Sequence, residues 1–220
     1  MAKRQQEKEA RRREREAREE AARRAASRKK ALQMAAGAGL VILAIAVVGL
    51  ILVGGGSGSS ADASTVAADA QAANCTFRQF PSEGREHVAQ KLTAKDYRTN
   101  PPTSGHHNPV PAPDGVYAPG NEPSVGNWVH SLEHGRILYQ YKPGTPAGDV
   151  ATLRGLAEQS LNGSQGYHTL VFQNNTNMPS QYAVVAWTRY LTCDQLTPQA
   201  QRAMRAFREA FTDQAPERIP

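Results

Sequence analysis

One run of nineteen residues without a charged or strongly polar side chain, from Ala35 to Val53, constrains this chain more than any other feature. As a helix with a rise of about 1.5 Å per residue it would extend about 28 Å, close to the thickness of a membrane hydrocarbon core. A cleaved signal peptide has a short basic start, whereas more than 30 residues rich in charge precede this run. We therefore expect a single-pass signal anchor at 35–53, with cleavage at the small residues 61–63 as the alternative.

Charge is divided unevenly along the chain. Residues 1–36 hold 13 of the 26 Lys and Arg and 6 of the 20 Asp and Glu, which leaves 13 basic and 14 acidic side chains for the rest. Basic residues beside an anchor favour the cytoplasmic side. We therefore expect a protein of the cell membrane with its N-terminus in the cytoplasm and its C-terminal part outside the cytoplasm. Arg28, Lys29 and Lys30 would meet anionic headgroups, which makes membrane lipid a predicted partner. Nucleic acid is not expected, because no aromatic residue is interleaved for stacking.

Composition divides the chain into four predicted segments. Residues 1–34 form a basic tail in which Glu precedes Arg at i,i+4 spacing, a pattern typical of a solvated helix. The anchor follows, and then residues 54–73, whose Gly, Ser and Ala content predicts a flexible linker. All aromatic residues, histidines and cysteines lie beyond residue 70, so only residues 74–220 have the side chains to build a core and a site.

The segment 74–220 is predicted to be a small mixed α/β domain. Stretches rich in β-branched and aromatic residues predict strands at 136–141, 167–173 and 182–190. Two stretches that open with Thr-Pro and carry an apolar stripe predict helices at 145–163 and 197–214. The whole chain is thus expected to be α+β: a charged helix, a transmembrane helix, a linker, and a domain with a central sheet and two helices.

Cys75 and Cys193 are the only cysteines, and both would face an oxidising compartment. They stand near the two ends of the predicted outer domain and have no other possible partner, so we expect a disulfide. A bridge that closes a loop of this length would stabilise the domain by about 4–5 kcal/mol if it acts through chain entropy. The alternative is a pair of buried free thiols.

The stretch "WVHSLEHGR", residues 128–136, places His130, Glu133 and His134 in the order H-x-x-E-H. On a helix, residues i and i+4 share one face at about 6 Å, so the two histidines could bind one metal ion. On a strand, about 13 Å would separate them. The secondary structure of this stretch therefore decides whether it can form a metal site.

Gly135 indicates how the stretch ends. A glycine is suited to terminate a helical turn ahead of the predicted strand, so we expect one turn of helix that brings His130 and His134 together. On that turn Glu133 would point away from both histidines or, like Ser131, support the ligands without touching the ion.

A proline-rich stretch supplies further candidates. Residues 99–127 hold seven prolines and predict a long loop, which in a compact domain is usually functional or disordered. His106 and His107 lie within it, and adjacent side chains of an extended segment face opposite ways, so one of them is expected to take no part. His87 is a third candidate ligand.

The chain resembles a family known as Domain of Unknown Function 3105, a group of bacterial, mostly actinobacterial, membrane-anchored or signal-bearing proteins. The resemblance rests on the motifs "NPPTSGHHNP", "DGVY", "VHSLEHGRILYQY", "AW" and a closing "APE". It implies that His107 is the family histidine, since the family usually has proline at the position of His106, and that His87 matches another frequent family histidine. Thr188 stands where the family often has glycine. The family name supplies no activity.

Three functions remain open. The leading hypothesis is a membrane-anchored extracytoplasmic module that binds copper or zinc through His107, His130 and His134, with His87 as a possible fourth ligand, because several imidazoles without thiolates suit these ions. The alternative is a scaffold domain that binds an envelope protein without metal. A zinc hydrolase is the third hypothesis, since H-x-x-E-H is also a peptidase signature. Its third ligand would be sought among Glu158, Glu209 and Glu217, and no catalytic residue is assigned.

Overall fold

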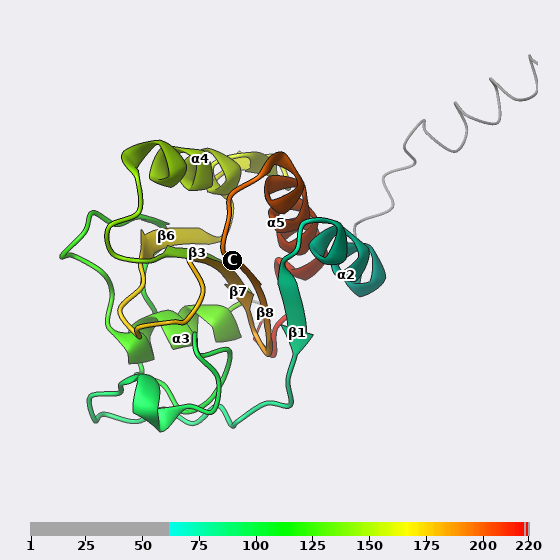
Figure 1. The fold of residues 1–220 in the computed structure, drawn as a ribbon. Helices are drawn as coiled ribbons and strands as arrows, with labels where there is room; N and C mark the ends of the chain where they lie inside the picture. The colour runs from blue at the N-terminus through cyan, green and yellow to red at the C-terminus, as the bar shows by residue number, and fades with distance from the viewer. Residues whose placement is uncertain (1–61, 218, 220) are drawn as a thin grey trace, which may run out of the picture. The chain divides into compact units, whose positions relative to one another are not determined.

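The computed structural model describes residues 62–217 and 219 (Figure 1). The helices are α2 (Ala63–Ala72), α3 (Val125–Glu133), α4 (Ala147–Ala157) and α5 (Pro198–Phe211), with a short 3-10 helix η1 (Ala94–Asp96). The strands are β1 (Thr76–Gln79), β2 (Gly115–Val116), β3 (Ile137–Tyr141), β4 (Ser160–Leu161), β5 (Ser164–Gln165), β6 (Thr169–Gln173), β7 (Tyr182–Ala186) and β8 (Arg189–Cys193).

The predicted tail 1–34, the predicted anchor 35–53 and the first part of the predicted linker lie outside the described residues. Within the part that is described, none of the helices combines the length and the apolar character needed to cross a membrane.

Six strands form the central sheet in the order β1-β8-β7-β3-β6-β2. The pairs β1–β8, β8–β7 and β7–β3 are antiparallel. The pairs β3–β6 and β6–β2 are parallel. Helix α4 connects the two parallel strands β3 and β6, as parallel pairing requires a crossover. The two remaining strands, β4 and β5, form a separate hairpin.

The sheet is covered on both faces, so every residue of the central strands β3 and β7 is buried, and all of them except Gln140 are apolar or aromatic. Ile137 and Tyr139 of β3 face a core shared with α2, α4 and α5. Leu138 faces the other core, which is closed by Trp128 and Leu132 of α3 and by the long loops. Figure 1 shows the three helices on one side of the sheet and α3 with the loops on the other. The candidate site lies in this second layer.

The described residues hold four α-helices where the fold prediction named two, and this is a correction: α3 was expected only as a single turn, and α2 was not expected. Helix α2 occupies residues 63–72, inside the range 54–73 that was expected to be a flexible linker. Asp62 caps it by accepting from the Thr65 N–H at 2.8 Å, and Val66 and Ala70 are buried against α5. Five alanines and the capping Asp62 favour a helix here, and packing against α5 adds to that local preference.

Two predicted elements were too long. The helix predicted at 145–163 ends at Ala157, and a hairpin follows whose turn residues Asn162 and Gly163 both have positive φ, 50° and 81°. The strand predicted at 182–190 is the hairpin of β7 and β8, which turns at Trp187 and Thr188. Thr188 adopts a φ of 62°, a conformation that glycine reaches without steric strain.

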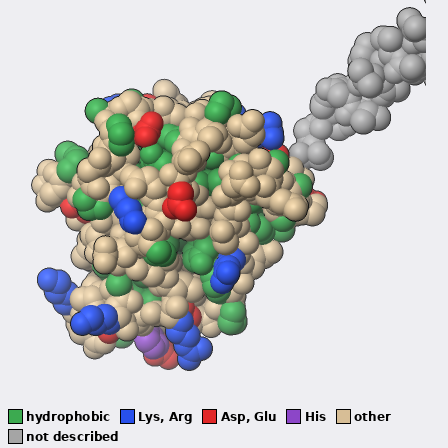
Figure 2. Space-filling view, in the orientation of Figure 1, with side chains coloured by type: hydrophobic (Ala, Val, Ile, Leu, Met, Phe, Trp, Pro, Cys, Tyr) green, Lys and Arg blue, Asp and Glu red, His purple; other side chains and the backbone are tan. Residues whose placement is uncertain are grey.

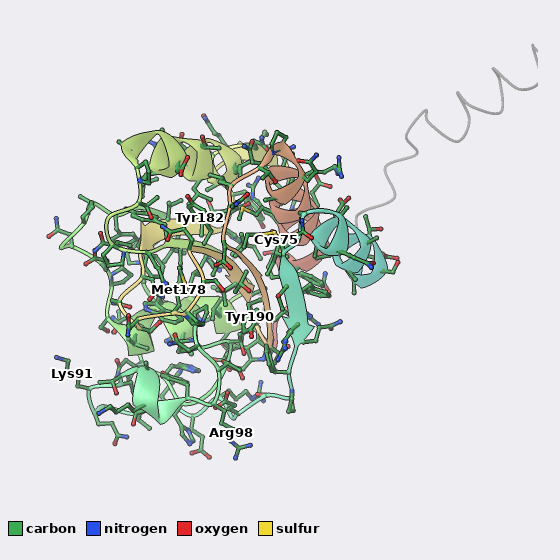
Figure 3. The ribbon with its side chains drawn as sticks, in the orientation of Figure 1. Cys75, Lys91, Arg98, Met178, Tyr182 and Tyr190 are labelled. Atoms are coloured by element: carbon green, nitrogen blue, oxygen red, sulfur yellow. A yellow bond between two sulfur atoms is a disulfide. The ribbon has the colours of Figure 1, made fainter. Side chains whose placement is uncertain are left out.

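The predicted disulfide between Cys75 and Cys193 is confirmed. Their Cα atoms lie 4.5 Å apart, next to the paired residues Thr76 and Thr192 of the edge strand β1 and its neighbour β8. Figure 3 shows Cys75 where α2 meets β1. The bridge therefore fastens the start of the domain to the sheet.

Candidate metal centre

Helix α3 brings the two histidines of the H-x-x-E-H motif together. It ends in a Schellman motif: the Gly135 N–H donates to Leu132 O at 3.0 Å, and the Arg136 N–H donates to Ser131 O at 3.1 Å. Gly135 has a φ of 80°, as the motif requires. The Nε2 atoms of His130 and His134 lie 2.9 Å apart. The predicted helical geometry is thus confirmed, although the helix has nine residues rather than one turn.

A short parallel pairing of two loops brings His87 beside His107. The Val88 N–H donates to His107 O at 2.8 Å, and the His107 N–H donates to Glu86 O at 3.1 Å. The two rings meet edge to face, with centroids 4.9 Å apart and an interplanar angle of 72°. His106 points the other way, with its side chain 52% exposed and its Nδ1 3.6 Å from the Glu86 carboxylate. Of the two adjacent histidines, His107 therefore belongs to the cluster and His106 does not.

His130 completes a triangle of rings. Its centroid lies 4.7 Å from that of His87 and 4.7 Å from that of His107. Glu133, on the same helix, places Oε2 2.9 Å from His107 Nε2. One possible ligand atom from each of these four residues lies within 4.8 Å of the others. We call His87, His107, His130 and Glu133 the histidine–glutamate cluster; its geometry could hold a metal ion.

Backbone carbonyls decide which nitrogen of each buried ring is available. His107 Nδ1 lies 2.8 Å from Gly105 O, and His130 Nδ1 lies 2.7 Å from Asn108 O. A carbonyl oxygen can only accept, so each Nδ1 must carry the proton. A neutral imidazole with Nδ1–H presents a lone pair at Nε2, which is how metal-binding histidines are commonly oriented.

The centre of the cluster holds unsatisfied polar atoms. His107 and Glu133 are 0% and 1% exposed. Among the described residues, His107 Nε2 and Glu133 Oε1 have no hydrogen-bond partner, even though Nε2 is close to Oε2. Buried polar groups in native proteins almost always have a partner, so these two atoms require an explanation.

The electrostatic environment favours neutral imidazoles. Burial lowers the pKa of His107 and of His130, and it lowers the pKa of His134 to about 4. Burial, followed by the neighbouring Glu217 carboxylate, raises the pKa of Glu133. The cluster therefore gathers electron-pair donors in a place that disfavours a second proton on His107 and on His130.

The other predicted site residues take different places. His134 lies beside the cluster, with Nε2 3.4 Å from Glu217 Oε2 as well as close to His130. The hydroxyl of Ser131 donates to Ala112 O at 2.9 Å and so fastens the proline-rich loop to α3. The sequence expected Glu133 to point away from the histidines or to support them from outside, whereas its carboxylate lies among the ring nitrogens.

Asn108 organises the site, and sequence reasoning did not single it out. Its carbonyl accepts from His130, its N–H donates to Gly126 O at 3.1 Å, and its side-chain amide donates to Val88 O and Gln90 O. It thus joins α3 to the segments that carry His87 and His107. Its position next to the paired histidines was the only available signal.

One member of the cluster reaches solvent. His87 is exposed, whereas His107, His130 and Glu133 are buried. His106 is exposed as well, and Figure 2 shows a small histidine surface at the lower end of the view, next to acidic and basic side chains. In Figure 3, Lys91 and Arg98 extend outward from the loops in the same region.

Comparison with known proteins agrees with the motifs. Residues 87–219 match the family described as "Protein of unknown function (DUF3105)". No curated protein and no solved structure matches the chain. The matched range covers more than half of the chain and includes all four residues of the histidine–glutamate cluster, so the chain belongs to the DUF3105 family.

Proposed function

We propose that the domain binds one divalent transition-metal ion, copper or zinc, through the histidine–glutamate cluster. The observation that carries the proposal is the pair of buried atoms without hydrogen-bond partners, His107 Nε2 and Glu133 Oε1. The lone pair of His107 faces a carboxylate, and an electron-pair acceptor between them would satisfy both. A metal ion has this property.

The available ligands suit copper and zinc. Imidazole nitrogens bind both ions, and a carboxylate completes many zinc sites. Thiolates cannot contribute, because the two cysteines of the chain are joined to each other. Three imidazoles and one carboxylate would supply the four ligands of a tetrahedral ion.

We further propose that the chain presents this site outside the cytoplasm, anchored to the membrane lipid by residues 35–53 and their basic flank. The disulfide supports an oxidising compartment. The exposed ligand His87 supports a role in holding and exchanging an ion, since an incoming partner could replace it without unfolding the domain. An envelope protein is the expected partner.

The competing hypotheses explain the contacts less well. A scaffold without metal accounts for the hydrogen bond from Ser131 to Ala112. It gives no reason why two of the six buried side-chain atoms that lack a partner among the described residues belong to one cluster of possible ligands. In a peptidase of the H-x-x-E-H type both histidines hold the ion and the glutamate acts as a base. Here Glu133 approaches His107 directly, and His134 Nε2 faces His130 and Glu217.

A proton shared between His107 Nε2 and Glu133 Oε2 is the remaining explanation, and Glu133→Gln separates it from a metal ion. The amide of Gln can donate to His107 Nε2, so the metal-free chain should keep its stability or gain about 1 kcal/mol. Zinc or copper binding should weaken by more than about tenfold, because the variant lacks the carboxylate ligand. Such a gain in stability with a loss of binding is typical of a functional site.

The full chain is first stripped of metal with a chelator. It is then titrated with Zn²⁺ or Cu²⁺ in the presence of a chromophoric chelator that competes for the ion. We expect one bound ion per chain in the wild type and none in His107→Phe. His106→Phe is the matched control: it changes the adjacent, exposed histidine and should bind like the wild type. Stoichiometric binding that survives His107→Phe combined with His130→Phe would falsify the proposed site.

A further inference from the structure

The hydrogen bond between His130 and His134 has a consequence for the proposed metal site. His130 Nδ1 donates to Asn108 O, so in a neutral ring Nε2 is the acceptor, and the 2.9 Å contact must be donated by His134 Nε2–H. An imidazole nitrogen of this kind has one lone pair. His134 therefore occupies the lone pair through which His130 would bind an ion.

A second acceptor stands beside the same N–H. Glu217 Oε2 lies 3.4 Å from His134 Nε2. The backbone N–H of Glu217 donates to Glu133 O at 3.1 Å, which holds this residue against the end of α3. Its side chain is 42% exposed and has freedom to approach.

The His134 ring borders open space as well. His134 and Arg136 line a pocket of about 200 Å³ together with residues 111–114 of the proline-rich loop. A small rotation of His134 is therefore not opposed by a packed wall on every side, unlike a rotation of the fully buried His107.

We propose that His134 is a hydrogen-bond switch that gates the metal site rather than one of its ligands. In the metal-free state its N–H blocks His130; when an ion binds, the N–H turns to the carboxylate of Glu217. This inference rests on the proposed function and names how the same site is regulated. It links metal binding to the C-terminal segment that follows α5, because Glu217 belongs to that segment.

Two substitutions at one position separate a gate from a ligand. His134→Phe keeps a ring but removes the donor, so His130 is free in advance and Zn²⁺ should bind about two- to tenfold more tightly, the range of one net hydrogen bond. His134→Gln keeps an N–H donor and should stay within about twofold of the wild type. If His134 were a ligand, both variants would lose affinity by more than about tenfold.

Glu217→Ala tests the other position of the switch, and we expect it to leave folding intact because the Glu217 side chain is 42% exposed. It should weaken Zn²⁺ binding by about two- to tenfold, because the displaced N–H loses its partner. In the His134→Phe background the same change should have no effect, which a double-mutant cycle measures.

All affinities are measured on the full chain with Zn²⁺ and a competing chelator. An unchanged or weaker affinity of His134→Phe, a gain in His134→Gln, or equal effects of Glu217→Ala in both backgrounds would overturn the switch. Failure of the wild type to bind Zn²⁺ or Cu²⁺ would instead overturn the proposed function, so the two failures are distinct.

Discussion

Replacing Gly135 by Ala tests whether the end of α3 and the C-terminal segment are held by close backbone contact. Gly135 has a φ of 80°, and a Cβ added there would lie 2.7 Å from Asp213 Cα and 3.0 Å from Asp213 N. The carbonyl of Gly135 accepts from the Asp213 N–H at 3.0 Å. Both elements that carry the proposed switch, α3 and the segment around Glu217, therefore meet at this glycine.

The expected loss has two parts. An L-residue in the left-handed region lowers the free energy of unfolding by about 1–2 kcal/mol. The smaller conformational freedom of Ala in the unfolded chain offsets about 0.4–1 kcal/mol of this loss. Non-bonded carbon atoms pack at about 3.5–4.0 Å, so the backbone of Asp213 must also move by several tenths of an ångström or more. Overpacking of this kind costs about 1–3 kcal/mol. We expect Gly135→Ala to lower the free energy of unfolding by about 2–4 kcal/mol.

Gly144→Ala provides the matched control. Gly144 has nearly the same φ, 81°, and nothing lies within 4 Å of a Cβ added there. It should show only the conformational part, about 1 kcal/mol or less. Urea unfolding followed by tryptophan fluorescence reports on this domain, because the only tryptophans are Trp128 and Trp187. If the two variants agree within about 0.5 kcal/mol, which is the usual scale of neutral changes, close packing against Asp213 is refuted.

Three further predictions use the same assays. Thr188→Gly should raise the free energy of unfolding by about 0.5–1 kcal/mol, because a β-branched residue with a φ of 62° is strained; no gain in the urea midpoint would contradict this. Reducing the disulfide between Cys75 and Cys193, which are 118 residues apart, should lower it by about 4–5 kcal/mol, whereas a loss below about 1 would show that the bridge constrains little. Gly126→Ala, whose new Cβ would lie 2.1 Å from Asn108 Oδ1, should weaken Zn²⁺ binding in the chelator titration without changing a ligand, and wild-type affinity would show that Asn108 does not position the site.

Features that depend on neighbouring residues could be predicted. The i,i+4 spacing of His130 and His134 and the glycine that follows them were sufficient to predict the helical end and the contact between the rings. The opposite directions of His106 and His107 follow from the period of an extended chain, although the choice of His107 came from the family resemblance. The disulfide followed from the presence of a single possible pair.

Features that depend on distant packing could not be predicted in the same way. Helix α2 carries local helix signals, five alanines and the capping Asp62, but its packing partner α5 lies more than 120 residues later in the chain. The hairpin of β4 and β5 did carry a local signal, since Asn-Gly at 162–163 is the strongest short-range hairpin signature. The apolar stripe of the preceding helix α4 outweighed that signal, so the helix was predicted to continue to residue 163.

The position of Glu133 shows why a ligand set is harder to predict than a motif. Spacing on α3 determines which way its side chain leaves the helix, but it does not determine what lies there. His107 lies there because the loop around it pairs with the segment of His87 and because Asn108 fastens that loop to α3. The same carbonyls that fix this arrangement also make Nε2 the acceptor nitrogen of His107 and of His130. The chemistry of the site is thus determined by backbone groups of Gly105 and Asn108, which no pattern of histidine spacing records.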